Sequence, residues 1–149
     1  MIQQTVEKLK DMRLTGFVAA VKEQQESVQY QKLDFDERFA LIVDKEYLIR
    51  KSRRLKRSIA KACLKQQATI EDIDFDTPRK LKRAEFLELA GGSWISNRHN
   101  LVIIGPTGIG KSFLACSLAD KACKLGFQAR YYRSNAFISE LLLAKADGS

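Results

Sequence analysis

LVIIGPTGIGKS, residues 101–112, is the stretch that decides the fold expected of this chain. Its first four residues are apolar and mostly β-branched, which is the composition of a short strand buried in a parallel sheet. Its last eight residues match the pattern G-x-x-x-x-G-K-[ST] at every fixed position, and loops of this pattern bind nucleotide phosphates. An amphipathic helix is predicted to follow over residues 113–123 and to end near Gly126.

The spacing of the loop follows from the chemistry of phosphate binding. Its glycines let the main chain curl so that successive N–H groups face phosphate oxygens with no Cβ in the way. Lys111 is expected to reach the β- and γ-phosphates, and the Ser112 hydroxyl is expected to ligate Mg²⁺. The predicted ligands are therefore ATP and Mg²⁺, and no catalytic residue is predicted. The binding residues are Gly105, Pro106, Thr107, Gly108, Ile109, Gly110, Lys111 and Ser112.

The residues after the loop continue the same pattern. Residues 127–132 predict a second strand, and Ser134 is expected to cap a final helix. Strand, loop, helix, strand and helix form the opening of a parallel α/β sheet. Hydrolysis by P-loop ATPases also needs an acidic residue on a neighbouring strand. No apolar strand ending in Asp or Asp-Glu follows residue 112, so hydrolysis is doubtful and the question of an enzyme stays open.

Before the loop, the chain is expected to be helical. Residues 3–26 predict a helix in which Gly16 marks a break, and residues 34–65, which contain no Gly or Pro, predict one long helix or two end to end. Asp34 or Asp36 is expected to cap its start. The acidic, turn-rich residues 68–80 are the best domain boundary, and a short helix is predicted over residues 79–90, ended by Gly91 and Gly92.

These elements define the expected fold class and domains. The fold class is α/β, with an N-terminal α-helical domain followed by the first half of a P-loop parallel sheet. Residues 1–68 are expected to form a helical domain, residues 69–100 a linker with a short helix, and residues 101–149 a partial P-loop domain that binds a nucleotide.

Positive charge is concentrated in one part of the chain. The formal net charge is +8, and residues 47–70 contain eight Lys or Arg and no acid. At 100° per residue, an apolar stripe that includes Leu48, Leu55 and Ile59 lies opposite a basic face. A solvated helix face is one explanation. However, basic side chains four residues apart repel one another, and no Asp or Glu within residues 47–70 offsets this repulsion. This instead favours a face that binds the phosphates of double-stranded DNA. The predicted DNA-binding residues are Arg50, Arg53, Arg54, Arg57, Lys61 and Lys65.

Other features narrow the class of protein. No apolar stretch approaches the roughly 20 residues of a membrane span, and no apolar signal segment opens the chain, so the expected location is the cytoplasm. Three cysteines without a CxxC pair argue against a disulfide framework or zinc site, and all three are expected to be buried. The lone His99 receives no catalytic role. Trp94 is expected to pack in the core rather than against adenine.

With these motifs in place, the sequence resembles the IstB family of transposition helper ATPases, members of the AAA+ class carried by insertion sequences, and more distantly the replicative helicase loaders. The resemblance lies in LDFDERFALIVDKEYLIRKSRRLKRSIAKACL (residues 33–64), ATIEDIDFDTPR (residues 68–79), SWISNRHNLVIIGPTGIGKS (residues 93–112) and LLLAKADGS (residues 141–149). It implies an ATP-dependent helper that assembles on DNA as a homo-oligomer and assists a transposase, with residues 1–68 as the domain for DNA binding and assembly and residues 101–149 as a partial ATP-binding domain. Family members continue through Walker B, sensor and arginine-finger residues, so the chain resembles a copy truncated after the Walker A region.

Two other functions stay open at this point. One is a nucleic-acid-binding or protein-interaction module with a vestigial P-loop, because a half-formed sheet leaves an open apolar edge. The other is a small-molecule or nucleotide kinase with the same loop, which would leave the basic helix without a role.

Overall fold

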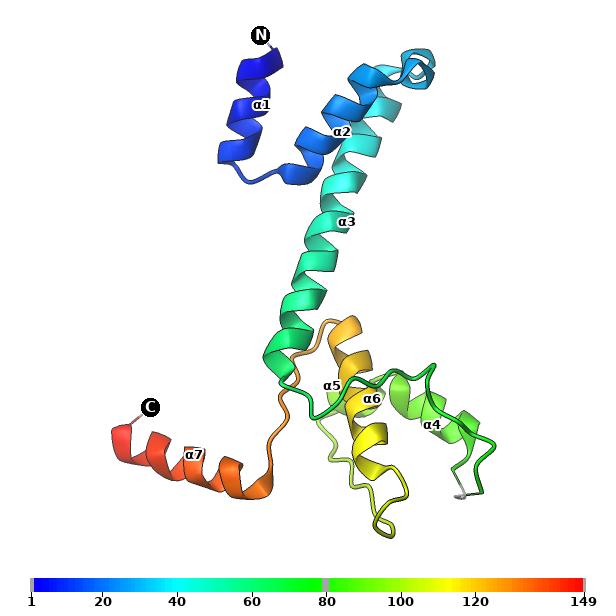
Figure 1. The fold of residues 1–149 in the computed structure, drawn as a ribbon, viewed down its shortest axis with the longest axis vertical. Helices are drawn as coiled ribbons and strands as arrows, with labels where there is room; N and C mark the ends of the chain where they lie inside the picture. Colours follow the sequence, from blue (N-terminus) through cyan, green and yellow to red (C-terminus); the bar gives the residue numbers. More distant parts are fainter. Residues whose placement is uncertain (1, 79–80, 149) are drawn as a thin grey trace. The chain divides into compact units, whose positions relative to one another are not determined.

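The computed structural model describes residues 2–78 and 81–148 and builds them from helices and connecting segments (Figure 1). The chain divides into two compact units, Met1–Arg54 and Leu55–Ser149, and the longest helix crosses this division. The helices are α1 (Ile2–Asp11), α2 (Thr15–Glu26), the 3₁₀ helix η1 (Val28–Lys32), α3 (Phe35–Ala62), α4 (Arg83–Ala90), α5 (Ser93–Ser96), α6 (Lys111–Lys124) and α7 (Ser134–Asp147).

The predicted parallel sheet is wrong, because no residue in the described ranges 2–78 and 81–148 forms a β-strand. Residues 101–104 keep the alternation of a strand: Leu101 and Ile103 pack on the helical core, whereas Val102 and Ile104 are 74% and 89% exposed. Residues 127–132 also lack strand structure, and the Tyr131 N–H donates to the Ala62 carbonyl at the end of α3, 2.8 Å away. Neither segment pairs with a neighbouring strand, and strands need such neighbours to satisfy their backbone polar groups.

The first unit contains a pair of helices in close contact. The predicted helix over residues 3–26 is interrupted, but at Met12–Leu14, where Arg13 has a φ of 57°, and not at Gly16. Gly16 instead lies in the first turn of α2, where a Cβ would come within 2.7 Å of the Glu46 Cα on α3. Its lack of a side chain therefore allows α2 to approach α3.

Helix α3 confirms the prediction of one long helix, with 28 residues. Its start is a reciprocal cap: the Glu37 N–H donates to Asp34 Oδ1 (2.8 Å), and the Asp34 N–H donates to Glu37 Oε2 (3.2 Å). Asp34 is thus the cap, as one of the two candidates predicted. The helix ends three residues before the predicted limit, where Cys63 has a φ of 49°.

The second unit has a small apolar core between α4 and α6. Its buried members are Ile73, Phe86, Ala90, Leu114 and Leu118. The short helix predicted over residues 79–90 is α4, with residues 79 and 80 outside the described residues. Helix α7 begins at Ser134, but Arg133 occupies the N-cap position and Ser134 makes no cap, so that part of the prediction is wrong. No residue of α7 is buried.

Two predictions about side chains and membranes can be compared with this fold. Cys116 and Cys123 are buried as expected, but Cys63 is exposed beyond the end of α3. Along the described chain, no helix has both the length and the apolar character needed to cross a membrane.

Candidate functional site

The loop predicted to bind phosphate leads directly into helix α6. Gly108 and Gly110 have φ values of 85° and 93°, in the left-handed region that side chains with a Cβ rarely adopt. Gly110 is the residue before α6 and has no side chain to cap it. The N–H groups of the first helical turn have no intrahelical acceptors. Together with the helix dipole, they give this end of α6 the polarity that favours an anion.

Lys111 connects the two ends of the loop. Its ammonium donates to the carbonyl oxygens of Gly105 (2.8 Å) and Pro106 (2.7 Å). These bonds use two of the three donors of a lysine and place its positive charge at the start of the loop. A phosphate reaching this ammonium must use the third donor or displace one of the carbonyls.

The other residues of the loop differ in accessibility. Thr107 is exposed, and Ser112 is partly buried in the first turn of α6. Among the described residues, no group of three His, Cys, Asp or Glu side chains is placed to hold a metal ion. The hydroxyl of Ser112 is a hard oxygen donor of the kind that Mg²⁺ prefers, so it fits a magnesium ion that takes its other ligands from phosphates and water.

An apolar hollow adjoins the loop but has a different character. It is lined by residues of α4, α6 and the segment 101–104, among them Phe86, Ile103 and Leu118. None of its lining side chains is polar. The hollow therefore offers no polar side chain to a phosphate, and the glycine-rich loop remains the candidate site.

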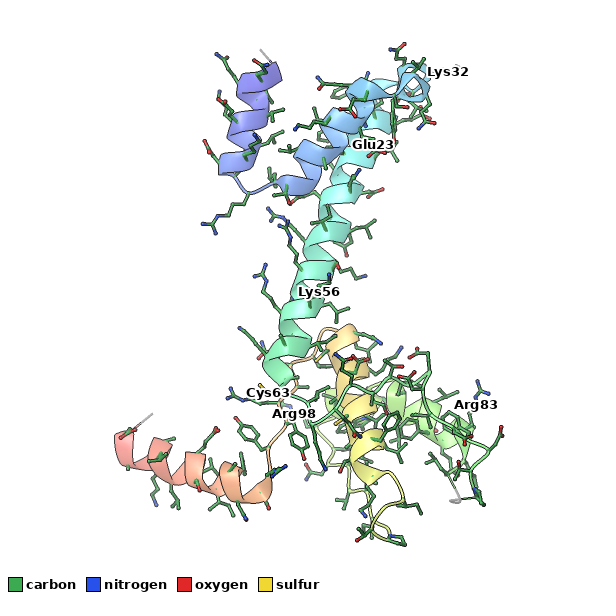
Figure 2. The ribbon with its side chains drawn as sticks, viewed as in Figure 1. Glu23, Lys32, Lys56, Cys63, Arg83 and Arg98 are labelled. Atoms are coloured by element: carbon green, nitrogen blue, oxygen red, sulfur yellow. The ribbon has the colours of Figure 1, made fainter. Side chains whose placement is uncertain are left out.

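All six predicted DNA-binding residues are exposed, and five of them lie on α3. Figure 2 draws the side chains of this helix and labels Lys56, another of its basic residues. Lys65 lies beyond the end of the helix and so is not part of its face. Arg50 Nε donates to Glu46 Oε1 (2.7 Å), and Arg53 Nη2 donates to Thr15 Oγ1 (2.8 Å). These two arginines therefore also bond within the first unit.

The buried carboxylate of Glu46 is a feature that sequence reasoning missed. Only 5% of this residue is exposed, and its Oε2 accepts the N–H groups of Gly16 (2.6 Å) and Phe17 (3.2 Å). Burial opposes ionisation of Glu46, but the hydrogen bonds from Arg50, Phe17 and Gly16 outweigh it and hold the pKa of Glu46 below its ordinary value. The carboxylate thus caps α2 from α3. In the sequence, an acid four residues before an arginine indicates the contact between Glu46 and Arg50, but no local pattern indicates the contacts with Gly16 and Phe17.

Trp94 and two aspartates of the acidic segment form local hydrogen bonds. The indole N–H of Trp94 donates to the Leu89 carbonyl (2.9 Å), and Trp94 is only partly buried. Asp72 Oδ2 accepts the N–H (3.0 Å) and the hydroxyl (2.7 Å) of Thr69, and Asp74 Oδ1 accepts the Asp76 N–H (2.9 Å). These aspartates stabilise turns.

The loop, its lysine and the helix that follows are typical of nucleotide-binding proteins, and comparison with known families identifies the class. The chain belongs to the family of IstB-like ATP-binding proteins, whose model matches residues 7–149. This confirms the resemblance inferred from the sequence motifs.

Curated relatives agree with this family. Over 150 residues the chain is 40% identical to the ATP-binding protein of insertion sequence IS1162 from Pseudomonas fluorescens, covering 100% of this chain and 65% of the relative. Over 144 residues it is 39% identical to an insertion sequence ATP-binding protein of Sinorhizobium fredii, covering 97% and 59%. A protein of insertion sequence IS21 from Pseudomonas aeruginosa is 27% identical over 140 residues, covering 94% and 52%. The chain thus spans less than two thirds of the length of these relatives.

Proposed function

We propose that this chain is an ATP-binding helper protein of DNA transposition that acts in the cytoplasm. It binds ATP with Mg²⁺ through residues 105–112 and double-stranded DNA through the basic residues of α3. The observation that carries the nucleotide part is the geometry of the loop: the left-handed Gly108 and Gly110 lead into the uncapped start of α6, and the ammonium of Lys111 reaches back to the Gly105 carbonyl at the start of the loop.

Each group in the loop has a separate task in this proposal. The first N–H groups of α6 bind phosphate oxygens, because they lack acceptors within the helix. Lys111 exchanges a carbonyl for a phosphate oxygen and so neutralises charge on the nucleotide. Ser112 would hold Mg²⁺, which offsets the negative charge of the phosphates when it is bound. The proposal concerns binding of the nucleotide and not its hydrolysis.

The DNA-binding part rests on charge. The eight bases of residues 47–70 are accompanied by no acid, and the arginines and lysines of α3 from Arg50 onward are exposed. Phosphate contacts from such residues release counterions and supply affinity without sequence preference. The names of the relatives refer to insertion sequences. The proposed protein partner is a transposase, and several copies of the chain are proposed to assemble on DNA.

Titration of the whole chain with ATP and Mg²⁺ tests the nucleotide part. Lys111→Ala is expected to weaken binding by about 10- to 150-fold, the equivalent of one charge-assisted hydrogen bond of about 1.5–3 kcal/mol. Lys121→Ala, on the same helix but near its other end, is the control and should bind like the wild type. Equal, negligible binding by wild type and Lys111→Ala would favour a nucleic-acid-binding or interaction protein with a vestigial loop.

Titration with a DNA duplex at several salt concentrations tests the second part. Affinity should fall steeply with salt, and combined Arg54→Glu and Arg57→Glu substitutions should abolish binding. Lys56→Glu makes the same charge change as Arg54→Glu alone, about 200° around the helix from Arg54, and should weaken binding much less than that single substitution. Binding that survived the double substitution would contradict the role of this face.

A further inference from the structure

Tyr47 is an aromatic residue that lies among the basic residues of α3 without taking part in the packing of the first unit. It is 61% exposed. Its hydroxyl makes no hydrogen bond to any other residue in the part of the chain that the structure describes. Exposure of one apolar residue is ordinary by itself, so its surroundings decide what it can do.

The neighbours of Tyr47 on the helix surface are basic. Arg50, Lys51 and Arg54 follow it by three, four and seven residues, which places all three within about 60° of it around the helix. The Lys51 ammonium lies 6.0 Å from the centre of the Tyr47 ring, at the limit of a cation–π interaction. Asp44, three residues earlier, ends this basic surface on its N-terminal side.

A tyrosine in this position suits a polyanion with closely spaced phosphates. Its hydroxyl is a neutral donor, so it adds a phosphate contact without adding another positive charge to a face that already carries like charges. Tyrosine hydroxyls are among the groups that bind phosphate oxygens and set the register of a protein on a duplex. The charge of the surrounding side chains selects double-stranded DNA over a protein surface as the occupant.

We propose that Tyr47 is a DNA-contacting residue whose hydroxyl donates a hydrogen bond to a backbone phosphate near those bound by Lys51 and Arg54. This inference rests on the proposed DNA binding of α3 and adds to it a residue that carries no charge. Because a neutral donor displaces no counterion of its own, its contribution should be insensitive to salt, unlike that of Arg54.

The test is duplex binding by the whole chain, measured by fluorescence anisotropy over a series of salt concentrations. Tyr47→Phe removes one exposed hydroxyl and is expected to weaken binding about tenfold with an unchanged slope of log affinity against log salt. Arg54→Ala is expected to reduce that slope by about one. Unchanged circular dichroism establishes that both variants keep their helices.

Two matched controls come from the same unit. Tyr30→Phe also removes a hydroxyl, but this one donates to Glu23 Oε1 (3.0 Å). Leu48→Ala truncates a side chain that is 62% exposed and lies about 100° around the helix from Tyr47. Both variants should bind DNA like the wild type.

The outcomes separate this inference from the proposed function. Wild-type affinity in Tyr47→Phe, with weakened binding in Arg54→Ala, would overturn the role of Tyr47 alone. A changed salt slope in Tyr47→Phe would also overturn it, because the residue would then act through the charge of its neighbours. Absence of duplex binding by the wild type would overturn the proposed DNA binding and this inference together.

Discussion

Replacing Glu46 with Gln is expected to loosen the attachment of α2 to α3. The carboxylate accepts three hydrogen bonds, from the N–H groups of Gly16 and Phe17 on one oxygen and from Arg50 on the other. A glutamine has only one carbonyl oxygen. The NH₂ group of the glutamine must therefore face either the backbone N–H groups or the Arg50 guanidinium, all of which are themselves donors. The amide also carries no negative charge to attract these donors.

The size of the effect follows from the burial of the groups involved. Hydrogen bonds to a charged acceptor contribute about 1.5–3 kcal/mol each. The Arg50 side chain is 58% exposed, so water replaces much of its contribution, whereas the contact with the Gly16 N–H is buried. The loss should therefore be close to that of one to two bonds, about 2–3 kcal/mol.

Native-state hydrogen exchange of the whole chain measures this loss where it occurs. The amides of Gly16 and Phe17 lie in the first turn of α2, where no intrahelical acceptor protects them, so their protection depends on Glu46. A loss of about 2–3 kcal/mol predicts exchange that is about 30- to 150-fold faster at these two amides.

Glu23→Gln supplies the control. Glu23 forms an exposed ion pair with Lys45, and its replacement should leave exchange at Gly16 and Phe17 as it is in the wild type. Unchanged protection of these amides in Glu46→Gln would refute the conclusion that the carboxylate holds α2.

Three further predictions follow from the same structure. The pKa of Glu46 is lowered from 4.5, so its contribution to stability should be complete above about pH 4.5 and be lost as the pH falls through the pKa of the folded state. The urea midpoint of unfolding should therefore decrease between about pH 7 and pH 3 in the wild type and decrease less in Glu46→Gln. Gly108→Ala should weaken ATP binding more than Gly105→Ala, as measured by calorimetry, because only Gly108 has a left-handed φ, at a cost of about 1–2 kcal/mol. Chelation of Mg²⁺ should lower the ATP affinity of the wild type several-fold and that of Ser112→Ala much less; equal losses would remove Ser112 as the metal ligand.

The features that the sequence predicted correctly are encoded within a few residues of one another. The cap of α3 is an Asp followed three residues later by a Glu, and the long helix that follows has no Gly or Pro to interrupt it. The loop of residues 105–112 is also a local pattern, with glycines, lysine and serine at fixed spacings, and phosphate binding by it stays a prediction.

The features that sequence reasoning missed depend on distant partners. The apolar segment of residues 101–104 has the composition of a strand, but a strand also requires neighbours, and composition does not supply them. Gly16 resembled a helix breaker, because its packing partner Glu46 lies 30 residues away. Lys65 was assigned to the basic face by extending the helical period past Ala62, where the backbone of Cys63 ends the helix.

The most direct test of the central claim is a map of the backbone amide chemical shifts of the whole chain during titration with Mg²⁺ and ATP. If the chain binds the nucleotide through its glycine-rich loop, the largest shifts should fall at residues 105–113 and should be lost in Lys111→Ala. Shifts that cluster instead around the apolar hollow near Phe86 and Leu118, or the absence of saturable shifts anywhere in the chain, would contradict ATP binding at this loop.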